Sequence, residues 1–175
     1  MRRKNGFTIL ELLVVIAISA IVTGGSLATF STFSKQQKLV NETQKMEDIL
    51  ATAKEKAISS ENADICAQYG GNYTLAGYLV YITQAVNIQT TQVKGSCTDT
   101  TNPFSLEQRP LVSTYTIDPV VSVANLPITV KFAVITGSAT VVGTMPITLQ
   151  SSTSRKKCIS ISTVGLIDEV SCISP

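Results

Sequence analysis

A single apolar run near the N-terminus constrains this chain more than any other feature. The stretch from Phe7 to Phe33 contains one charged side chain, Glu11. An α-helix that crosses the hydrocarbon core of a bilayer needs about 20 apolar residues. Because the run is longer than that, it predicts a transmembrane helix, and the more polar remainder of the chain must then lie outside the bilayer.

Basic residues directly before this run predict its orientation. Arg2, Arg3 and Lys4 precede it, and such charges stay on the cytoplasmic side of a membrane helix. The N-terminus is therefore expected in the cytoplasm and the rest of the chain beyond the membrane. A removable secretory signal peptide is the alternative, since segment 17–20 partly matches a small-residue cleavage site. Such peptides have an apolar core of about 7–15 residues, however, which is shorter than this run.

Glu11 is the residue in this run that needs an explanation. A carboxylate at bilayer depth costs roughly 2.5–3.5 kcal/mol on insertion scales. One explanation is that Glu11, one helical turn inside the apolar edge, reaches the headgroups or becomes protonated. Its neighbours suggest another. The segment 4–18 (KNGFTILELLVVIAI) resembles the class III signal of type IV pilins and pseudopilins, with Gly6 as the cleavage glycine, Phe7 after it and Glu11 at the matching offset.

This resemblance covers approximately the segment 1–30 and implies a processing pathway. A membrane-bound prepilin peptidase and methyltransferase would cut between Gly6 and Phe7 on the cytoplasmic side and methylate the new amino group of Phe7. The apolar helix would stay attached and form the core of a filament. The implied partners are other pilin or pseudopilin subunits, the membrane and an assembly platform.

Cleavage would change the charges at this end of the chain. It removes Arg2, Arg3 and Lys4, which leaves 11 basic against 12 acidic side chains, and it creates an α-amino cation on Phe7. In a bundle of apolar helices, Glu11 of an incoming subunit can pair with the Phe7 amine of a neighbour, because an unpaired buried charge is heavily penalised. We therefore expect Glu11 to set the axial register of assembly and to make assembly depend on cleavage.

Gly24 and Gly25 interrupt the apolar helix. Each glycine costs about 1 kcal/mol relative to alanine inside a helix. The pair predicts either a local loosening of the helix or a close approach by another helix, and both alternatives fit the residues.

A second helical segment, 34–61, follows the apolar run. Its apolar residues recur at spacings of three, four and seven, at Leu39, Met46, Ile49, Leu50, Ala53, Ala57 and Ile58. Such spacing places them on one face of a helix. Together the two segments predict one helix from Phe7 to about Ser59, roughly 80 Å long. The apolar face is expected to pack on a head domain, with a coiled-coil stalk as the alternative.

Beyond Asn62 the chain becomes rich in Thr, Val, Ser, Ile and Gly, which predicts a β-rich head over 62–175. Gly137-Ser138 is typical of a tight hairpin turn. The fold class is therefore expected to be α+β, pilin-like, with a small antiparallel sheet packed on the amphipathic helix. The candidate strands are Tyr78–Thr83, Val86–Thr91, Val112–Ile117, Ile128–Thr136, Thr140–Leu149, Cys158–Ser162 and Leu166–Ile173.

Four cysteines, Cys66, Cys97, Cys158 and Cys172, lie beyond the apolar segment. An even number outside the membrane predicts disulfides, with buried free thiols as the alternative. Cys158 and Cys172 are equidistant from Gly165, so a hairpin that turns at 163–165 would place them directly opposite each other, near disulfide distance. Of three possible pairings, this favours Cys158–Cys172 and leaves Cys66–Cys97 to join the helix-to-sheet connection.

A second resemblance lies near the end of the chain. Segment 157–167 (KCISISTVGLI) is similar to the terminal hairpin of the GspH/FimT group of pseudopilins and minor pilins. Some minor pilins of that group bind DNA through arginines just after the turn glycine, where this chain has Leu166, Ile167 and Asp168. DNA binding is therefore disfavoured. The basic segment Arg155–Lys157 is the remaining candidate for it, although such charges are common on strand edges, where they discourage aggregation.

Composition argues against several kinds of function. The chain has no histidine, which is the commonest general base and transition-metal ligand, and no CxxC pair for zinc. It lacks a phosphate-binding loop and a GxSxG motif, and Asp168 and Glu169 are neighbours that point to opposite faces of a strand. We predict no enzyme activity, metal or cofactor. The near-neutral charge gives no overall attraction to nucleic acid.

The expected function is structural. The chain is predicted to be a minor pilin or pseudopilin that leaves the membrane for an extracytoplasmic filament, in a type IV pilus, a competence system or a type II secretion system. The alternative is a binding module at a filament tip, either an adhesin or a DNA-uptake minor pilin.

Overall fold

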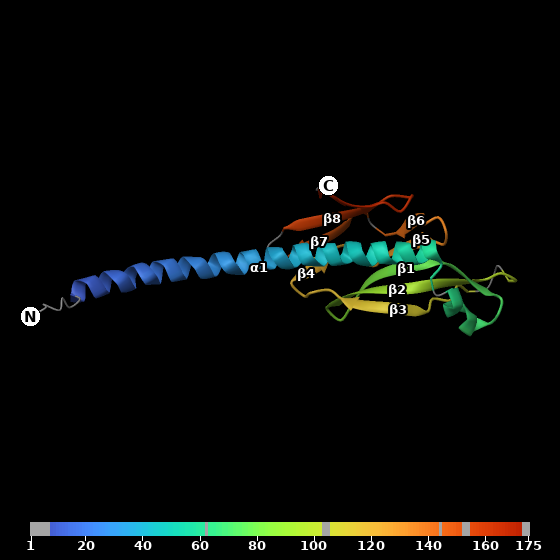
Figure 1. Cartoon of the computed structure of the whole chain (residues 1–175), viewed down its shortest axis with the longest axis horizontal. Coiled ribbons are helices and arrows are strands. Elements are labelled where there is room, and N and C mark those ends of the chain that lie inside the picture. Colours follow the sequence, from blue (N-terminus) through green and yellow to red (C-terminus); the bar gives the residue numbers. More distant parts are fainter. Residues whose placement is uncertain (1–7, 62, 103–105, 144, 152–154, 173–175) are drawn as a thin grey trace, which may run out of the picture.

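The computed structural model describes residues 8–61, 63–102, 106–143, 145–151 and 155–172, without the side chains of 24–29. One long helix, α1 (Ile9–Ser59), projects from a β-rich head (Figure 1). A 3₁₀ segment, η1 (Ala63–Tyr69), connects the helix to the strands. This arrangement confirms the predicted α+β fold class.

α1 begins and ends on local capping groups. Its 51 residues correspond to about 77 Å at 1.5 Å per residue. At the start, the Glu11 N–H donates to the Thr8 hydroxyl at 3.2 Å. At the end, Ser60 adopts a left-handed conformation and the Glu61 N–H donates to the Lys56 carbonyl, which closes the last turn. The predicted first residue, Phe7, lies outside the described residues.

The second half of α1 is packed on the head through one face. The buried positions of this face follow spacings of three and four residues: Leu39, Thr43, Met46, Ile49, Leu50, Ala53 and Ala57. Thr43 was not predicted among them. Its hydroxyl donates to the Leu39 carbonyl at 2.8 Å, so it needs no partner from the head. Ile58 was wrongly assigned to this face: it is 46% exposed, because it lies past the last buried turn and only its tip covers Gly137.

The head consists of two antiparallel sheets rather than the single sheet predicted. The larger has the strand order β3-β2-β1-β5-β6 and the smaller β4-β7-β8-β9. Their bounds are β1 (Tyr73–Ala85), β2 (Ile88–Asp99), β3 (Leu111–Thr116), β4 (Val121–Val123), β5 (Ile128–Ala133), β6 (Ala139–Val142), β7 (Ile147–Ser151), β8 (Lys156–Ile161) and β9 (Ile167–Val170).

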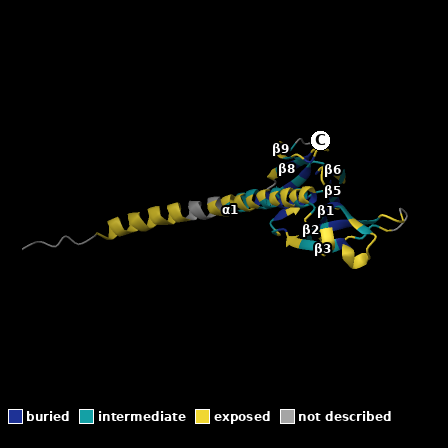
Figure 2. Cartoon of the chain, turned by 45° about the vertical axis from the view of Figure 1, so that its right-hand side comes forward, coloured by how far each residue is buried: buried dark blue, intermediate teal, exposed yellow. Residues whose placement is uncertain are grey.

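Both sheets contact the helix, so the core lies between them and α1. α1 packs against β1 and β5 of the larger sheet and against β7 and β8 of the smaller one (Figure 1). Tyr78, Val80 and Phe132 are fully buried in this core, as are Leu149 and Ile159 of the smaller sheet. Figure 2 shows the result: buried residues gather in the head and along the adjoining part of α1, while the projecting part of the helix is exposed.

Besides differences in the strand ends, the structure departs from the predicted strands in three ways. The single strand predicted over Thr140–Leu149 is two strands in different sheets, β6 and β7, because Gly143 between them has a φ of +128°. Strand β4 was missed because it is only three residues long. Val86 was expected to begin a strand, but it forms a turn with Asn87 in which both residues have positive φ. The tight turn predicted at Gly137-Ser138 lies within a longer loop, 134–138.

Two disulfides join the pairs that the sequence favoured. Cys66 is bonded to Cys97 and Cys158 to Cys172, with Cα–Cα distances of 5.5 and 5.3 Å. The first joins η1 to β2, so it ties the segment after α1 to the larger sheet. The second joins β8 to the chain beyond β9.

The register predicted for the last hairpin is wrong by two residues. Cys158 lies opposite Val170 rather than opposite Cys172. The reason is that the three-residue turn 163–165 is centred on Val164, with the left-handed Gly165 (φ +78°) as its last residue, as is common for hairpin loops of this length. Cys172 lies beyond the end of β9 and still reaches Cys158.

Candidate assembly surface

The first half of α1 presents an apolar surface that no other described part of the chain covers. Ten large aliphatic residues between Ile9 and Val22 are 51–82% exposed, and they occupy all sides of the helix (Figure 2). Soluble monomers rarely expose contiguous apolar patches larger than a few hundred Å². This surface is therefore expected to be covered by lipid or by other protein chains.

Two hydroxyl groups between Ile9 and Thr23 do not interrupt the apolar character of this surface. Ser19 donates through Oγ to the Val15 carbonyl at 2.8 Å, and Thr23 donates through Oγ1 to the Ser19 carbonyl at 2.6 Å. Because each hydroxyl proton is used within the helix, neither side chain needs water as an acceptor. The surface from Ile9 to Thr23 is thus suited to apolar surroundings.

Glu11 is the charged residue on this surface. It occupies the first turn of α1 and is exposed, and the helix dipole favours a carboxylate there. None of the ion pairs among the described residues involves Glu11. The cap at Thr8 was missed in the sequence, although Thr8 and Glu11 have the three-residue spacing of a capping box.

Several predicted site residues stay predictions. Gly6 and Phe7, the expected cleavage and methylation site, lie outside the described residues. Gly24 and Gly25 lie within α1, which is helical through them. The structure of a single chain does not test whether they loosen the helix or allow another helix to approach.

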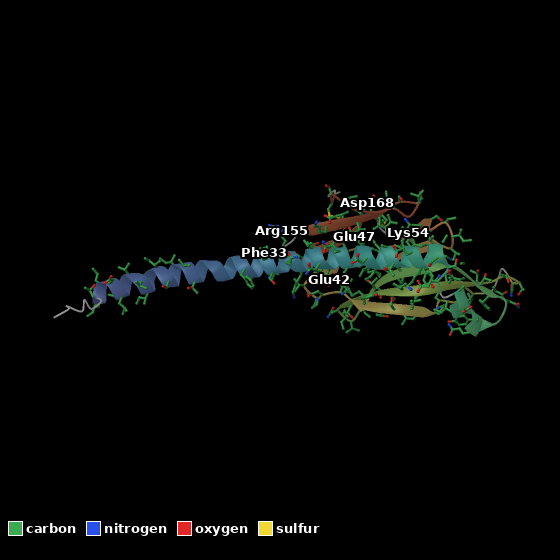
Figure 3. All side chains as sticks on the ribbon, in the orientation of Figure 1. Phe33, Glu42, Glu47, Lys54, Arg155 and Asp168 are labelled. Carbon is green, nitrogen blue, oxygen red and sulfur yellow. A yellow bond between two sulfur atoms is a disulfide. The ribbon has the colours of Figure 1, made fainter. Side chains whose placement is uncertain are left out.

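The head begins to cover α1 just after Phe33, which is exposed and lies where the helix leaves the head (Figure 3). Leu39 is already buried. Beside it, Lys38 Nζ lies 3.1 Å from Asp118 Oδ2 in the loop before β4. A hydrogen bond from the Val120 N–H and the charge of Lys38 together hold the pKa of Asp118 below its usual value. This end of the head is therefore attached to α1 by an ion pair as well as by apolar packing.

Negative charges lie beside the basic segment Arg155–Lys157. Lys157 forms an ion pair with Glu169. Part of the positive charge of this segment is therefore neutralised within the chain. Glu47 of α1 is close enough to this region that burial and the charges of Glu169 and Asp168 raise its pKa (Figure 3). The mixture of charges does not favour a phosphate backbone, whose binding depends on several accessible cations.

The described part of the chain holds no group of three or more His, Cys, Asp and Glu side chains that could bind a metal ion. No helix in it is long and apolar enough to cross a membrane. The transmembrane role predicted for 7–33 accordingly stays a prediction.

Comparison with known proteins identifies one motif. Residues 1–27 match the family described as the prokaryotic N-terminal methylation motif. This range contains Gly6, Phe7 and Glu11, so the class III signal that the sequence resembles is present, and it points to a structural subunit rather than an enzyme. No curated protein and no solved structure matches the chain. The likeness of the last hairpin to the GspH/FimT group therefore rests on its own residues.

Proposed function

We propose that this chain is a type IV pilin-like structural subunit, cut between Gly6 and Phe7, methylated on the new Phe7 amine and assembled into a filament through its apolar helix. The observation that carries the proposal is the uncovered apolar first half of α1, which overlaps the N-terminal methylation motif. Lipid covers this half before assembly, and the helices of neighbouring subunits cover it afterwards.

The same helical surface suits both surroundings. A helix that is apolar on all sides is stable in a bilayer or in the interior of a helix bundle. The second half of α1 has its own cover, because both sheets of the head pack on it. A transfer from membrane to filament would then change the surroundings of the first half alone, and the head would remain outside the membrane throughout.

Glu11 makes that transfer selective. Left unpaired in lipid, its carboxylate costs roughly 2.5–3.5 kcal/mol. The methylated amine of Phe7 is a cation that exists only after cleavage, and an ion pair between it and Glu11 of the next subunit relieves two unpaired charges at once. Assembly therefore depends on prior processing, and the pair sets the axial offset between subunits.

Replacing Glu11 in the full-length chain tests this proposal. We expect Glu11→Val and Glu11→Gln to be cleaved after Gly6 but to lower the yield of sedimentable filaments at least tenfold, since 1.4 kcal/mol corresponds to a factor of ten. Glu55→Val is the matched control, because Glu55 is exposed on the head-packed half of α1 and is in none of the ion pairs of the described residues.

Two results would contradict it. Wild-type filament yield from Glu11→Val would exclude the pairing role, and mass spectrometry that finds an intact Met1 terminus in filaments would exclude cleavage.

On the likeness of the last hairpin, we further propose that the subunit is a minor pilin or pseudopilin of a pilus, competence or type II secretion filament. Its partners would be the processing enzyme, other subunits and an assembly platform.

A further inference from the structure

The larger sheet has a face turned away from α1, which we name the outer face, and basic side chains gather on it. Val80 of β1 is fully buried in the core, so its neighbours Leu79 and Tyr81 point to the outer face. Lys94 of β2 and Lys131 of β5 lie directly opposite Leu79, one on each side of β1. Both lysines therefore share the outer face with Leu79 and Tyr81.

An arginine beside these lysines is held in place by the chain itself. The segment 106–110 is attached to β2, since Gln108 and Cys97 exchange two backbone hydrogen bonds, at 2.8 and 2.9 Å. From this segment, Arg109 donates through Nε and Nη2 to Glu107 Oε2, at 3.0 and 2.7 Å. Because the guanidinium is already oriented, less conformational freedom is lost when a ligand binds to it.

This group of side chains carries excess positive charge. Glu107 Oε1 accepts from Lys131 Nζ at 2.7 Å. Burial opposes the ionisation of Glu107, but hydrogen bonds from Lys131, Ser96 and Arg109 outweigh it and hold its pKa at about 2. One carboxylate in the group thus faces three cations. The third cation, Lys94, is in none of the ion pairs that the described residues form.

A pocket lies beside these cations, and we name it the basic pocket. Its volume is about 220 Å³, and it is lined by Leu79, Tyr81, Lys94, Arg109 and Thr129. Lys94 Nζ is 5.5 Å from the centre of the Tyr81 ring, whose face attracts a cation. Lys94 and Arg109 bring together a compact ammonium and a planar guanidinium, which are the groups that bind carboxylates and phosphates. The basic pocket therefore suits one small anionic group.

A second pocket, which we name the polar pocket, also borders Tyr81. Its volume is about 470 Å³, and its lining is uncharged: Tyr81, Thr83, Gln84, Val123, Asn125, Leu126 and Pro127. The side chains of Thr83 and Asn125 make none of the hydrogen bonds found among the described residues. A hydroxyl and an amide can each donate and accept, so both side chains are available to a ligand.

A ligand that binds both pockets must have an anionic group at one end and uncharged hydrogen-bonding groups at the other. Sugar hydroxyls both donate and accept, as the side chains of the polar pocket do. A nucleic acid carries a charge on every phosphate, which the uncharged polar pocket does not match. A peptide cannot add here as a strand, because β1 is already paired with β2 on one side and β5 on the other.

We propose that the outer face binds an acidic oligosaccharide, with its carboxylate on Lys94 and Arg109 in the basic pocket and its neutral sugars in the polar pocket. The sugars extend past Tyr81, which both pockets share, toward Thr83. This binding site goes beyond the proposed function. It lies on the head, on the far side of the sheet from α1, so it requires neither cleavage after Gly6 nor assembly.

Calorimetric titration of the full-length chain in an uncharged polyoxyethylene detergent tests the proposal. The probes are two trisaccharides with one terminal carboxylate sugar, 3′-sialyllactose and glucuronate-capped xylobiose. We expect at least one of them to bind about tenfold more tightly than its neutral part, lactose or xylobiose. Binding that is equal for charged and neutral sugars would overturn the proposal, as would no binding of either trisaccharide at millimolar concentration.

Variants in each pocket assign the contacts. Lys94→Gln should weaken binding of the acidic trisaccharide about tenfold and leave binding of its neutral part unchanged. Thr83→Val keeps the shape of the side chain and should weaken the trisaccharide but not the free acidic monosaccharide. Lys156→Gln is the matched control, because Lys156 is exposed on β8 of the other sheet and forms no ion pair with a described residue. Wild-type affinity in Lys94→Gln would contradict the site.

Two competitors identify other kinds of ligand. Inorganic phosphate that binds as tightly as the trisaccharide would indicate a simple anion site, and a short oligothymidylate that binds more tightly would indicate a nucleic acid. Either result would overturn the proposal. Because these titrations involve no filaments, a chain that binds the sugar but never assembles contradicts the proposed function alone, and a chain that assembles without binding the sugar contradicts this inference alone.

Discussion

The two halves of α1 share one backbone conformation and differ in what covers them. The second half is amphipathic, and both sheets of the head bury its apolar face. The first half is apolar all round between Ile9 and Val22, where its large aliphatic side chains are more than half exposed. Most helix stability in proteins comes from tertiary packing rather than from propensity. The first half therefore has to obtain from other molecules the packing that the second half obtains from its own chain.

This difference explains why one helix can serve two roles. Changes in the second half act on the stability of the head, whereas changes in the first half act on contacts with lipid or other subunits. Matched substitutions in the two halves should separate these effects.

The largest effect is expected for a leucine in each half. Leu50 is fully buried, so Leu50→Ala should lower the free energy of unfolding of the head by about 2–5 kcal/mol. Leu13→Ala removes the same atoms from the exposed half and should change that free energy by less than about 0.5 kcal/mol, while lowering filament yield. Chemical denaturation of the full chain in detergent measures the first quantity. Equal losses of stability from the two variants would contradict the comparison.

Tyr78 gives the next largest effect, at the junction where α1 ends. It is fully buried, and its hydroxyl donates to the Glu61 carbonyl, so Tyr78→Phe should cost about 1–1.5 kcal/mol. Burial raises the pKa of Tyr78, so the folded state prefers the neutral phenol. The wild-type head should keep this stability below about pH 10 and lose it as the pH rises toward the raised pKa. A pH series of unfolding should show no such loss in Tyr78→Phe, and identical alkaline profiles would refute the assignment.

The sequence predicted those features that depend on local pattern. Spacing at Leu39, Met46 and Leu50 identified the packed face of α1, and cysteine positions favoured the pairs found. Thr43 escaped prediction because a hydroxyl bonded back to the preceding turn is buried without being apolar. For the first half of α1, the length of the apolar run was the only feature that predicted an exposed apolar surface.

Features that depend on distant segments were not predicted. The division into two sheets follows from which strands face each side of α1, and no local pattern reports that. The hairpin register depended on whether Val164 or Gly165 was the centre of the turn, a difference of one residue that shifted every pair by two. The turn at Val86 and Asn87, in which both residues have positive φ, contradicts the local preference of valine, so propensity did not predict it.

A smaller effect is expected at the boundary between the halves. Gly25→Ala should stabilise the local helix by about 1 kcal/mol and slow hydrogen exchange of nearby amides about fivefold, measured by mass spectrometry in detergent. Ala17→Gly, in the same half, is the control and should have the opposite effect. If loosening at Gly24 and Gly25 serves assembly, the Gly25 variant should also form fewer filaments. Unchanged amide hydrogen exchange in Gly25→Ala would mean that another contact already stabilises this segment of the helix.

The smallest effect is expected at the ion pair that begins the packed half. Asn can still accept from the Val120 N–H, so Asp118→Asn removes mainly the charge opposite Lys38 and should cost about 0.5 kcal/mol, because both side chains are partly exposed. The lowered pKa of Asp118 means that this stability is present above about pH 4 and is lost as the pH falls through the lower value of the folded state. The difference between wild type and variant should shrink with added salt. Lys38→Gln in a double-mutant cycle isolates the pair; a coupling energy near zero at low salt would show that Asp118 acts through its hydrogen bond from the Val120 N–H instead.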